Sequence, residues 1–289
     1  MYKYAKSFCR KDGLSMKRIV IIPNDTKDVG LSVTKSLVEI LSGKAELYME
    51  NKFLASGFNV NFMGDDIFEK ADFVIVIGGD GTMLQVAEPC GKFGIPVMGI
   101  NMGRGGFMTE VEIDDMNKSC ERLLQGDYII EKRMMMDIKV NKNGQETNIY
   151  SALNDTVLSK VDAKMISVEL YADVNKINAY IADGIIIATP TGSTGYSLSA
   201  GGPVADPTME LFIASPICAH MLNSRPAVMP ADKEIILKLS AGDATVTVDG
   251  VVSERLTEGD KVIISKSDYT VDIIKMSGCS FYDVLINKL

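Results

Sequence analysis

The sharpest chemical motif of the chain is residues 78–82, Gly-Gly-Asp-Gly-Thr, in which three glycines surround one aspartate. It follows the apolar run 73–77, so it joins a buried strand to a helix that we expect to begin near Thr82. Glycine lets a backbone approach a ligand without an intervening Cβ atom, and the N–H groups at a helix start attract anions. Because the motif is neither GxGxxG nor a P-loop, it predicts a phosphate-binding loop of a different kind.

Asp80, inside this motif, has two possible roles. As a turn residue or helix cap it would accept a backbone N–H group. Next to a phosphate it could instead hold Mg²⁺ or accept the proton of an attacking hydroxyl, as phosphoryl transfer requires. A simple cap does not need flanking glycines on both sides, so we interpret Asp80 as functional.

A second glycine-rich segment, residues 182–203, carries hydroxyl groups in place of charge. An apolar strand at 185–189 leads into a loop whose Gly192 and Gly195 would let a flat base or a ribose lie close to the backbone. This loop suits hydrogen bonding to a neutral adenosine better than nucleophilic catalysis, because the chain's one histidine, His220, could approach it only in space. Its hydroxyl-bearing candidates are Thr191, Ser193, Thr194, Ser197 and Ser199.

The elements that position the first motif belong to residues 17–124. Apolar runs of strand length alternate there with stretches of helix length, which predicts an α/β domain with a mostly parallel sheet. We expect strands at 19–22, 73–77 and 95–100, and helices at 29–41, from 82 onward and at 116–124.

Residues 125–275 instead contain many short strand patterns separated by turn signals, which predicts a largely antiparallel, all-β domain. Asp249-Gly250 between two apolar triplets predicts a tight hairpin. We expect residues 276–289, with helical spacing at 281–289, to pack back on the first domain. The strands are expected at 134–140, 166–172, 185–189, 235–239, 245–248, 262–265 and 269–274.

Composition excludes several classes of protein. A net charge of −8 and a pI near 4.9 argue against an extended nucleic-acid surface. Five scattered cysteines and one histidine offer almost no zinc ligands, and no apolar run is long enough to span a membrane. Residues 1–16 lack the apolar core of a secretory signal, and the residues before Met16 are expected to be either a frayed extension or the product of an upstream start. We therefore expect a cytoplasmic protein with neither nucleic acid nor membrane as partner.

Taken in this order, the motifs resemble those of the NAD kinase family. Residues 78–82 match its GGDGT motif, and residues 183–184 with 189–203 match its long second motif nearly throughout. Asn154-Asp155 falls where the family carries an Asn-Glu pair. Residues 101–107 are similar to its N-x-G-x-L-G-F loop, residues 220–226 to its H-x-L-x-x-R-P segment, and Asp249-Gly250 has a counterpart. The resemblance runs from about residue 17 to the C-terminus.

The resemblance implies a two-domain architecture in which residues 125–275 form the dinucleotide-binding domain. It implies transfer of the γ-phosphoryl of ATP, or of another donor, to the 2′-hydroxyl of the adenosine ribose of NAD, giving NADP. Mg²⁺ or another divalent cation would accompany the donor, and no residue is expected to be a metal ligand of its own. The family also implies a homodimer or homotetramer.

Residue roles follow from the same resemblance. Asp80 would be the base or the orienting group for the 2′-hydroxyl, Phe107 would pack near the adenine, and Asp183 would face the nicotinamide half, often across a subunit contact. Asn154 would read the adenosine and Asp155 its ribose. Gly79, Gly81 and Thr82 would shape the phosphate loop, and Thr191, Thr194, Gly195, Tyr196, Ser197 and Ser199 belong to the loop that would line the dinucleotide.

Three positions depart from the family pattern, and two other functions remain open. Asp155 replaces Glu, Gly195 replaces Ala and Gly105 replaces Leu. A lipid kinase of the diacylglycerol or sphingosine type shares GGDGT, but the 189–203 loop has no counterpart in such enzymes. A non-catalytic NAD(P) sensor is the other alternative, and the intact Asp80 speaks against it.

Overall fold

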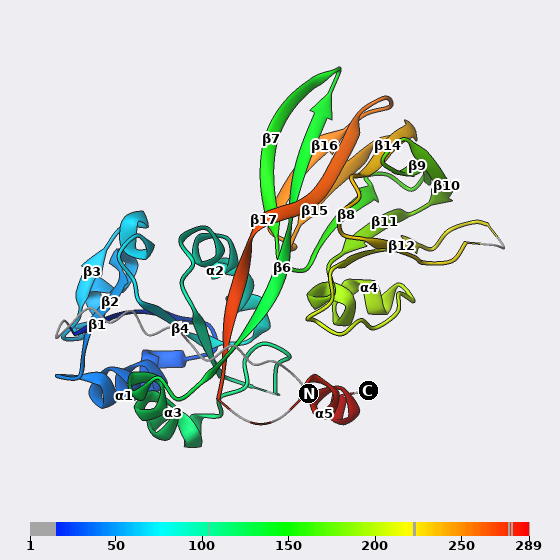
Figure 1. Cartoon of the computed structure of the whole chain (residues 1–289). Coiled ribbons are helices and arrows are strands. Elements are labelled where there is room, and N and C mark those ends of the chain that lie inside the picture. The colour runs from blue at the N-terminus through cyan, green and yellow to red at the C-terminus, as the bar shows by residue number, and fades with distance from the viewer. Residues whose placement is uncertain (1–15, 104, 222–223, 277, 279, 289) are drawn as a thin grey trace. The chain divides into compact units, whose positions relative to one another are not determined.

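The structure is a computed structural model that describes residues 16–103, 105–221, 224–276, 278 and 280–288. The expected extension at residues 1–15, Arg104 of the 101–107 loop, and Leu222 and Asn223 of the 220–226 segment lie outside the described residues. The chain divides into two compact units (Figure 1). Unit 1 comprises Met1–Lys132 and Val271–Leu289, and unit 2 comprises Arg133–Thr270.

Unit 1 contains a parallel sheet in the order β3-β2-β1-β4-β5, followed by the end of β17. Its central strands are buried on both faces, as continuous apolar runs require. The α/β class expected from the sequence is therefore confirmed. The strands are β1 (Lys17–Pro23), β2 (Ala45–Glu50), β3 (Asn61–Met63), β4 (Phe73–Gly78), β5 (Val97–Asn101) and the part of β17 (Lys261–Lys275) from residue 271 onward.

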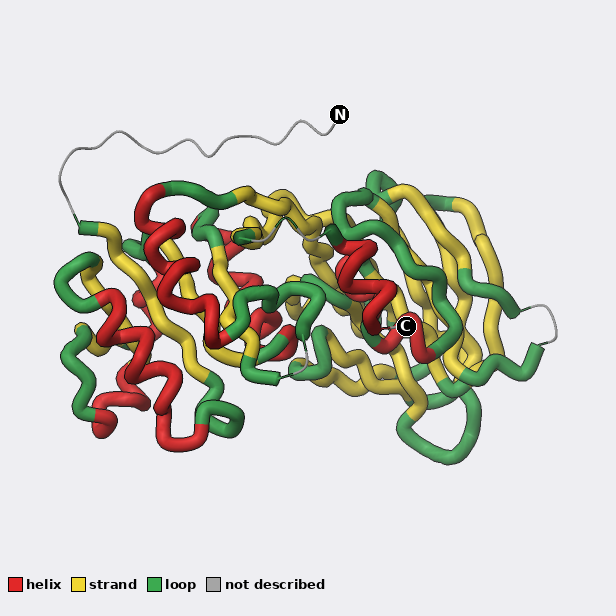
Figure 2. Tube along the Cα trace, turned by 90° about the horizontal axis from the view of Figure 1, so that it is seen from below, coloured by secondary structure: helices red, strands yellow, loops and turns green. Residues whose placement is uncertain are grey.

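Helices cover both faces of this sheet (Figures 1 and 2). α1 (Ser32–Leu41) and α3 (Met116–Gln125) lie on one face, where their leucines pack with alternate residues of β1 and β4. α2 (Asp80–Phe93) lies on the other face. Left-handed Gly94 and Gly126 end α2 and α3. The remaining short elements of unit 1 are η1 (Val29–Leu31), η2 (Asn51–Ser56), η3 (Asp65–Phe68), η4 (Ile113–Asp115) and α5 (Phe281–Lys288).

Unit 2 consists of two antiparallel sheets. The first has the order β13-β12-β11-β8-β15-β16, and the second contains β10-β9-β14 and the first part of β17, which also pairs with β6. The strands are β6 (Ile129–Lys142), β7 (Gln145–Ala152), β8 (Asp155–Lys160), β9 (Ile166–Ala172), β10 (Asn175–Ala182), β11 (Gly184–Ala188), β12 (Leu211–Ile217), β13 (Ala227–Pro230), β14 (Ile235–Ala241), β15 (Ala244–Val248) and β16 (Val252–Leu256). η5 (Thr191–Thr194) and α4 (Tyr196–Ser199) follow β11.

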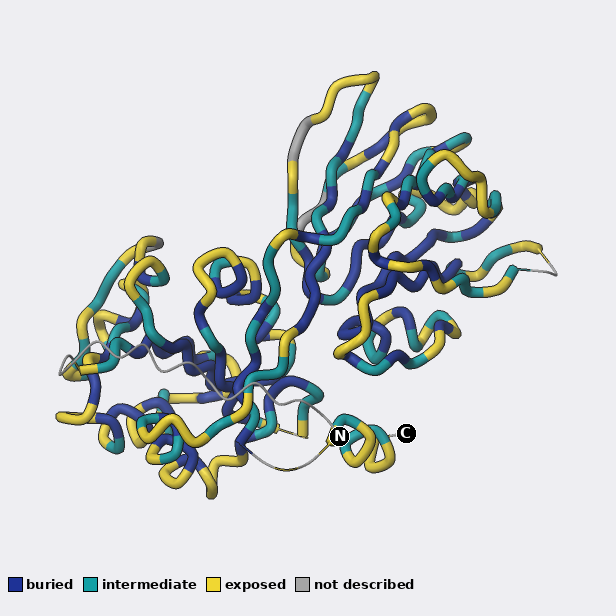
Figure 3. Tube along the Cα trace, viewed as in Figure 1, coloured by how far each residue is buried: buried dark blue, intermediate teal, exposed yellow. Residues whose placement is uncertain are grey.

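The two sheets of unit 2 share one apolar core, visible as the dark strands of Figure 3. Ile185, Ile187 and Phe212 of the first sheet pack in the same cluster as Leu170 and Leu237 of the second. The strands supply this core in an alternating pattern: in β9, every second side chain is buried. The largely antiparallel β domain expected from the sequence is therefore confirmed.

Two turn predictions have different outcomes. Asp249 and Gly250 both adopt positive φ, 45° and 74°, and join β15 to β16, so the predicted hairpin is confirmed. The prediction of separate strands at 262–265 and 269–274 is wrong, because β17 continues through both. The polar residues between them include neither Gly nor Pro, so nothing in the backbone interrupts the strand.

Among the helices that the structure describes, none is both long and apolar enough to cross a membrane.

Asp28 sets the start of α1. Its side chain is buried, and its carboxylate accepts the N–H group of Val33 at 3.0 Å and both the N–H and the hydroxyl of Thr34 at 2.9 and 2.6 Å. These donors belong to the first turn of the helix, which has no intrahelical acceptor for them. Asp28 is therefore committed to a structural role.

We expect Asp28→Ala to lower the free energy of unfolding by about 2 kcal/mol, because it leaves these donors unpaired in the interior. Urea denaturation measures the change. Asp25→Ala is the matched control, since Asp25 is exposed in the same loop, and it should change stability by less than about 0.5 kcal/mol. Equal stability of the two variants would contradict the capping role.

Candidate functional site

The 78–82 loop leaves the carboxyl end of β4 and enters α2 directly. A Cβ atom on Gly78 would overlap the side chain of Thr82, and one on Gly79 would lie 2.7 Å from Nζ of Lys27. Neither glycine has a positive φ. Close approach requires glycine at position 78, whereas at position 79 the neighbour is the end of a long lysine side chain, which can move aside. Gly81 is exposed with nothing near it, and Thr82 is buried, its hydroxyl oxygen accepting Nδ2–H of Asn24 at 2.9 Å.

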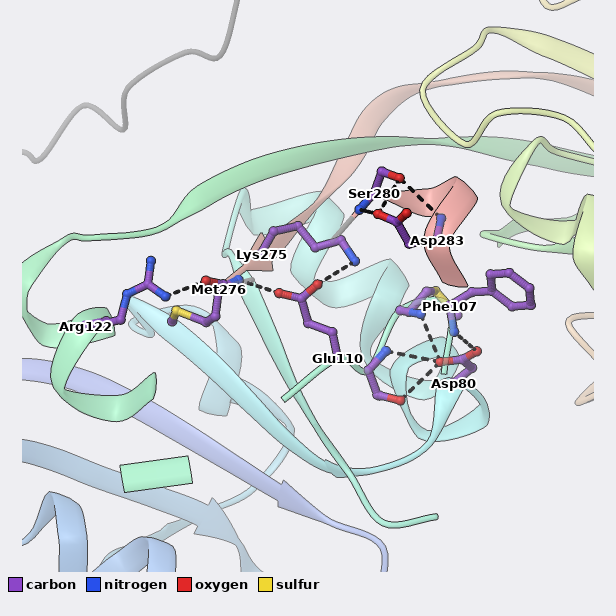
Figure 4. A network of polar contacts seen from close by, with 10 residues as sticks. Asp80, Phe107, Glu110, Arg122, Lys275, Met276, Ser280 and Asp283 are labelled. Carbon is purple, nitrogen blue, oxygen red and sulfur yellow. Dashed lines mark hydrogen bonds and ion pairs between the residues drawn. The ribbon is translucent and has the colours of Figure 1, made fainter. Parts of the chain in front are cut away.

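Asp80 begins α2, yet its carboxylate binds a different segment (Figure 4). Its Oδ2 accepts the N–H group of Phe107 at 2.8 Å. Its Oδ1 accepts the N–H groups of Met108 and Thr109 at 3.1 and 3.2 Å, and the Thr109 hydroxyl at 3.3 Å. Asp80 therefore joins the phosphate-type loop to the 106–109 loop.

The remaining capacity of this carboxylate decides what it can do. A carboxylate has about four lone-pair positions, two on each oxygen. Oδ1 already has three donors, whereas Oδ2 has one, from Phe107. Oδ2 of Asp80 can thus accept one further donor, such as an alcohol hydroxyl, without releasing the loop.

Phe107 lies between Asp80 and the C-terminal helix α5 of the same unit. Its ring is tilted against that of Phe281, with 5.8 Å between centroids, and Nζ of Lys288 lies 4.4 Å from its centroid. Near the start of α5, Ser280 and Asp283 exchange hydrogen bonds of 2.8 to 3.2 Å (Figure 4). Phe107 is therefore oriented by its own backbone hydrogen bond and by α5.

In unit 2, Asp249 plays an equivalent part at the 153–155 turn. Its carboxylate accepts the N–H groups of Leu153, Asn154 and Asp155 at 2.8, 2.9 and 2.9 Å. The backbone N–H group of Asp249 in turn donates to the carbonyl of Asp155 at 3.0 Å. The hairpin turn thereby fixes the two adjacent residues, Asn154 and Asp155, that the sequence singled out.

The second glycine-rich loop lies directly against this turn. Thr189 donates its N–H group to the carbonyl of Asn154 at 2.9 Å and its hydroxyl to that of Leu153 at 2.5 Å. A Cβ atom on Gly192 would overlap the backbone of Asn154. A Cβ atom on Gly195 would lie 3.9 Å from both Nδ2 of Asn154 and Oδ2 of Asp155. A Cβ atom on Gly195 would also lie 3.3 Å from the carbonyl oxygen of Gly192, so the structure brings Asn154, Asp155 and Gly195 close together.

Asn154 and Asp155 carry unused polar capacity at this place. Oδ1 of Asn154 is buried without a partner among the described residues, which is costly unless a ligand supplies a donor. Burial raises the pKa of Asp155 to about 7, with a smaller contribution from the nearby charge of Asp249. Burial also raises the pKa of Asp249. The three backbone N–H groups that donate to its carboxylate lower that pKa, but by less than burial raises it. An adenosine would supply donors to such acceptors.

The hydroxyl-bearing residues of the loop separate into two groups. Ser197 is buried and its Oγ lies 2.9 Å from that of Ser215, while the hydroxyl of Thr191 accepts a hydrogen bond from buried Arg133 at 3.3 Å. These two side chains therefore support the loop from inside. Ser193 likewise bonds to the backbone of residue 205.

Thr194, Tyr196 and Ser199 lie on the outer side of the same loop. Tyr196 and Ser199 are exposed, and Thr194 is partly exposed, with its hydroxyl donating to the carbonyl of Thr191 at 3.3 Å. These are the hydroxyls of the loop that a ligand can reach.

Asp183 lies apart from this group. Asp183 precedes β11 and Thr189 follows it, so six residue steps of extended chain separate the two by about 20 Å. Its carboxylate pairs with Lys160 at 2.6 Å and remains partly exposed. The structure thus brings most of the predicted residues of unit 2 together but leaves Asp183 at the opposite end of the strand.

Four residues near these loops were not identified as site residues from sequence: Asn24, Lys27, Thr109 and Thr189. For Asn24 and Lys27 a signal existed, since both follow the buried strand β1, whose neighbour in the parallel sheet is β4. Loops at the carboxyl ends of adjacent parallel strands meet at one edge of the sheet. Asp249 was identified only as a turn residue.

No group of three or more His, Cys, Asp or Glu side chains able to hold a metal occurs within the described ranges. Asp80 could supply at most one oxygen ligand to a metal ion, through the free lone pair of its Oδ2.

Two family models match the chain. The ATP-NAD kinase N-terminal domain matches residues 19–128, and the ATP-NAD kinase C-terminal domain matches residues 153–276.

Similar curated proteins cover nearly the whole chain. The NAD kinase of Thermoanaerobacter sp. (strain X514) is 41% identical over 281 residues, which is 95% of this chain and 99% of the relative. The NAD kinase of Ruminiclostridium cellulolyticum is 38% identical over 288 residues, covering 95% and 98%.

Two solved structures share the fold. A crystal structure of yeast NADH kinase complexed with NADH matches with a TM-score of 0.87 at 21% identity, covering 96% of this chain and 88% of the other. An NAD kinase from Archaeoglobus fulgidus in complex with ATP matches with a TM-score of 0.71 at 26% identity, covering 94% and 98%. At 21% identity, the yeast match supports the fold alone.

The close approach at Gly106 predicts a stability effect. A Cβ atom there would overlap Oδ1 of Asp80 and the hydroxyl of Thr109, so Gly106→Ala should break these hydrogen bonds and cost about 1–3 kcal/mol in the free energy of unfolding. Denaturant unfolding measures the loss. Gly105→Ala is the matched control, because nothing lies within 4 Å of that position and its stability should change by less than about 0.5 kcal/mol. Unchanged stability of Gly106→Ala would refute the packing of this loop on Asp80.

The Asp155–Asp249 pair predicts a pH dependence of stability. The native state retains a proton on Asp155 up to about pH 7, whereas the unfolded chain loses it near its ordinary pKa of 3.8. The unfolded state therefore binds fewer protons across this window, and this group makes the free energy of unfolding fall as pH rises from about 4 to 7.

We accordingly expect Asp155→Asn to gain stability over the native protein as pH rises, by on the order of 1 kcal/mol or more at pH 8, with little difference below pH 4. Thermal unfolding across this range measures the difference. Asp162→Asn, at an exposed carboxylate of the same unit, is the matched control. A pH-independent difference for Asp155→Asn would rule out the raised pKa.

Proposed function

This chain belongs to the NAD kinase family and phosphorylates NAD to NADP, and on that premise we propose how its residues divide the reaction. The γ-phosphoryl of ATP, or of another donor, is transferred to the 2′-hydroxyl of the adenosine ribose. The observation that carries the proposal is the carboxylate of Asp80, which keeps one lone pair on Oδ2 while holding the 106–109 loop. The matches give no support to the lipid-kinase and sensor alternatives.

Asp80 orients the 2′-hydroxyl and accepts its proton. A hydroxyl that donates to Oδ2 has its own oxygen lone pair turned away from the carboxylate, towards the phosphorus it attacks. The backbone donors on Oδ1 prevent the carboxylate from rotating. Positioning of this kind supplies much of the acceleration in phosphoryl transfer.

The 78–82 loop binds the phosphates of the donor. Gly81 is exposed and leaves the backbone at the start of α2 accessible, so its N–H groups and the positive end of the helix can face an anion. Thr82, whose hydroxyl bonds to Asn24, acts as support for the loop and not as a ligand.

A divalent cation is proposed to arrive with the triphosphate. Mg²⁺ in such sites takes most of its ligands from phosphate oxygens and waters, which fits a loop that offers one carboxylate oxygen and no acidic cluster within its described residues. When bound, the cation neutralises charge on the triphosphate. The protein's own task is to fix the loop and the hydroxyl.

The adenosine of NAD is proposed to bind in unit 2 at the 153–155 turn. The unpaired Oδ1 of Asn154 can accept the exocyclic amine of adenine, and the carboxylate of Asp155 can accept ribose hydroxyls. Gly195 places its backbone beside both side chains, without a Cβ atom of its own. Thr194, Tyr196 and Ser199 would line the dinucleotide from the outer side of the loop, while Thr191 and Ser197 hold that loop from within.

A homo-oligomer is proposed as the working form. β10 is an edge strand of its sheet, and Ile177 and Ile181 on it are 45% and 49% exposed. Exposed apolar side chains on an edge strand favour association with another copy. Asp183, adjoining this strand and distant from the adenosine turn, would then face a dinucleotide bound by a partner subunit. A cytoplasmic location stays a prediction from sequence.

We expect Asp80→Asn to reduce NADP formation by about 100-fold or more, because the amide cannot accept the proton of the 2′-hydroxyl. Production of NADP from NAD, ATP and Mg²⁺, followed with an NADP-specific dehydrogenase, measures turnover. Affinity for NAD, measured by calorimetry, should stay within a few-fold. Asp25→Asn serves as control and should retain full turnover, since Asp25 is exposed in the loop after β1. An Asp80→Asn variant with near-normal turnover would exclude Asp80 as the proton acceptor.

A further inference from the structure

The loop that follows β1, residues 24–28, runs beside the 78–82 loop. β1 and β4 are parallel neighbours in register, with Pro23 opposite Ile77, so both loops leave the same edge of the sheet. The N–H group of Asn24 continues the ladder by donating to the carbonyl of Ile77 at 2.8 Å. The position of the first loop is therefore tied to that of the second.

Asn24 makes this connection rigid. Its Nδ2 donates to the hydroxyl of Thr82 at 2.9 Å, while its Oδ1 accepts the hydroxyl of Thr26 at 2.7 Å and the N–H group of Lys27 at 3.1 Å. One side chain thus holds both the last residue of the glycine motif and the backbone of Lys27.

Lys27 directs its amine at the glycine motif. Its Nζ lies 2.7 Å from the position that a Cβ atom on Gly79 would occupy, although the residue as a whole is exposed. Among the described residues, no carboxylate pairs with this amine. The adjacent Asp28 is turned inward to cap α1, and the carboxylate of Asp80 is engaged by the 106–109 loop.

A cation in this position has a physical use. The chain carries a net charge of −8, which opposes the approach of a polyphosphate. Backbone N–H groups supply partial charges only, whereas an ammonium supplies a full charge that three rotatable donors can direct to phosphate oxygens. The side chain is long and held only at its backbone, so it can follow the terminal phosphoryl group as negative charge shifts during transfer.

We propose that Lys27 is a donor-binding residue whose ammonium contacts an oxygen of the terminal phosphates of the phosphoryl donor at the 78–82 loop. This rests on the proposed function of that loop. The residue lies outside both glycine-rich motifs, and only the pairing of β1 with β4 brings it to the site. Lys27 acts on the donor and not on NAD, which distinguishes it from a residue that merely stabilises unit 1.

Steady-state kinetics on the full chain test the proposal. Lys27→Met keeps much of the side-chain length but removes the charge, and it should raise KM for MgATP, or lower kcat/KM for it, by about tenfold or more. KM for NAD should stay within twofold. Lys27→Arg should recover most of the loss, because it restores a cation. Lys35→Met, at an exposed lysine of α1 in the same unit, is the matched control and should change neither constant.

Salt provides a further readout. The difference in kcat/KM for MgATP between the native protein and Lys27→Met should shrink at about 0.5 M salt, because salt screens an exposed charge interaction. A structural role would give a difference that persists in salt. Equal losses towards MgATP and NAD, or no loss towards either, would overturn the proposal.

Direct binding separates this proposal from the function on which it rests. Calorimetry with inorganic tripolyphosphate and Mg²⁺, without NAD, should show binding to the native protein that is about tenfold weaker in Lys27→Met. If the native protein forms no NADP but this difference appears, the proposed function fails and the anion contact of Lys27 stands. If NADP forms and Lys27→Met alters neither the kinetics nor the tripolyphosphate affinity, the Lys27 proposal fails and the kinase function stands.

Discussion

One interaction recurs at both candidate loops: an aspartate carboxylate that accepts the N–H groups of three consecutive residues. Asp80 does so for residues 107–109, and Asp249 does so for residues 153–155. A partly buried carboxylate needs strong donors to offset its lost hydration, and consecutive N–H groups of a tight turn supply them. Each carboxylate thereby determines the backbone conformation of a loop distant from it in sequence. The side chains proposed to face the ligands in both units depend on these two bonding patterns.

Glycines complete this arrangement by allowing backbones to touch. Gly78, Gly106 and Gly192 each occupy a position where a Cβ atom would overlap a neighbouring side chain or backbone. None of the three has a positive φ, so space and not conformation selects glycine there. The loops can then pack tightly enough for their hydroxyls and carboxylates to hold one another, which leaves a few polar atoms, such as Oδ1 of Asn154, unpaired.

Electrostatics differ between the two units. In unit 2 the adjacent carboxyl groups of Asp155 and Asp249 are desolvated, and burial raises the pKa of both. That environment suits a neutral, hydroxyl-rich ligand. In unit 1 the carboxylate of Asp80 is compensated by its backbone donors, and the amine of Lys27 lies beside the glycine motif. An acidic protein can in this way present one locally favourable place for phosphate.

The sequence by itself determined the two fold classes and the hairpin at Asp249-Gly250, and it predicted Asp80 and Asn154 as site residues. These features depend on local patterns, namely apolar periodicity, glycine at a strand end and turn chemistry, which are readable within a few residues. It also predicted an interruption in β17 that does not exist, since polar residues in a long strand look like a turn when its pairing partners are unknown.

Only the tertiary structure decided which distant residues meet. It placed Lys27 beside Gly79 through the register of β1 and β4, and it joined Asp249 to a turn more than 90 residues earlier. It also turned Ser197 inward to Ser215, away from the outer face of its loop. These outcomes depend on sheet register and on the competition for buried hydrogen-bond partners, which involve pairs of segments and are therefore not encoded in any single stretch of the chain.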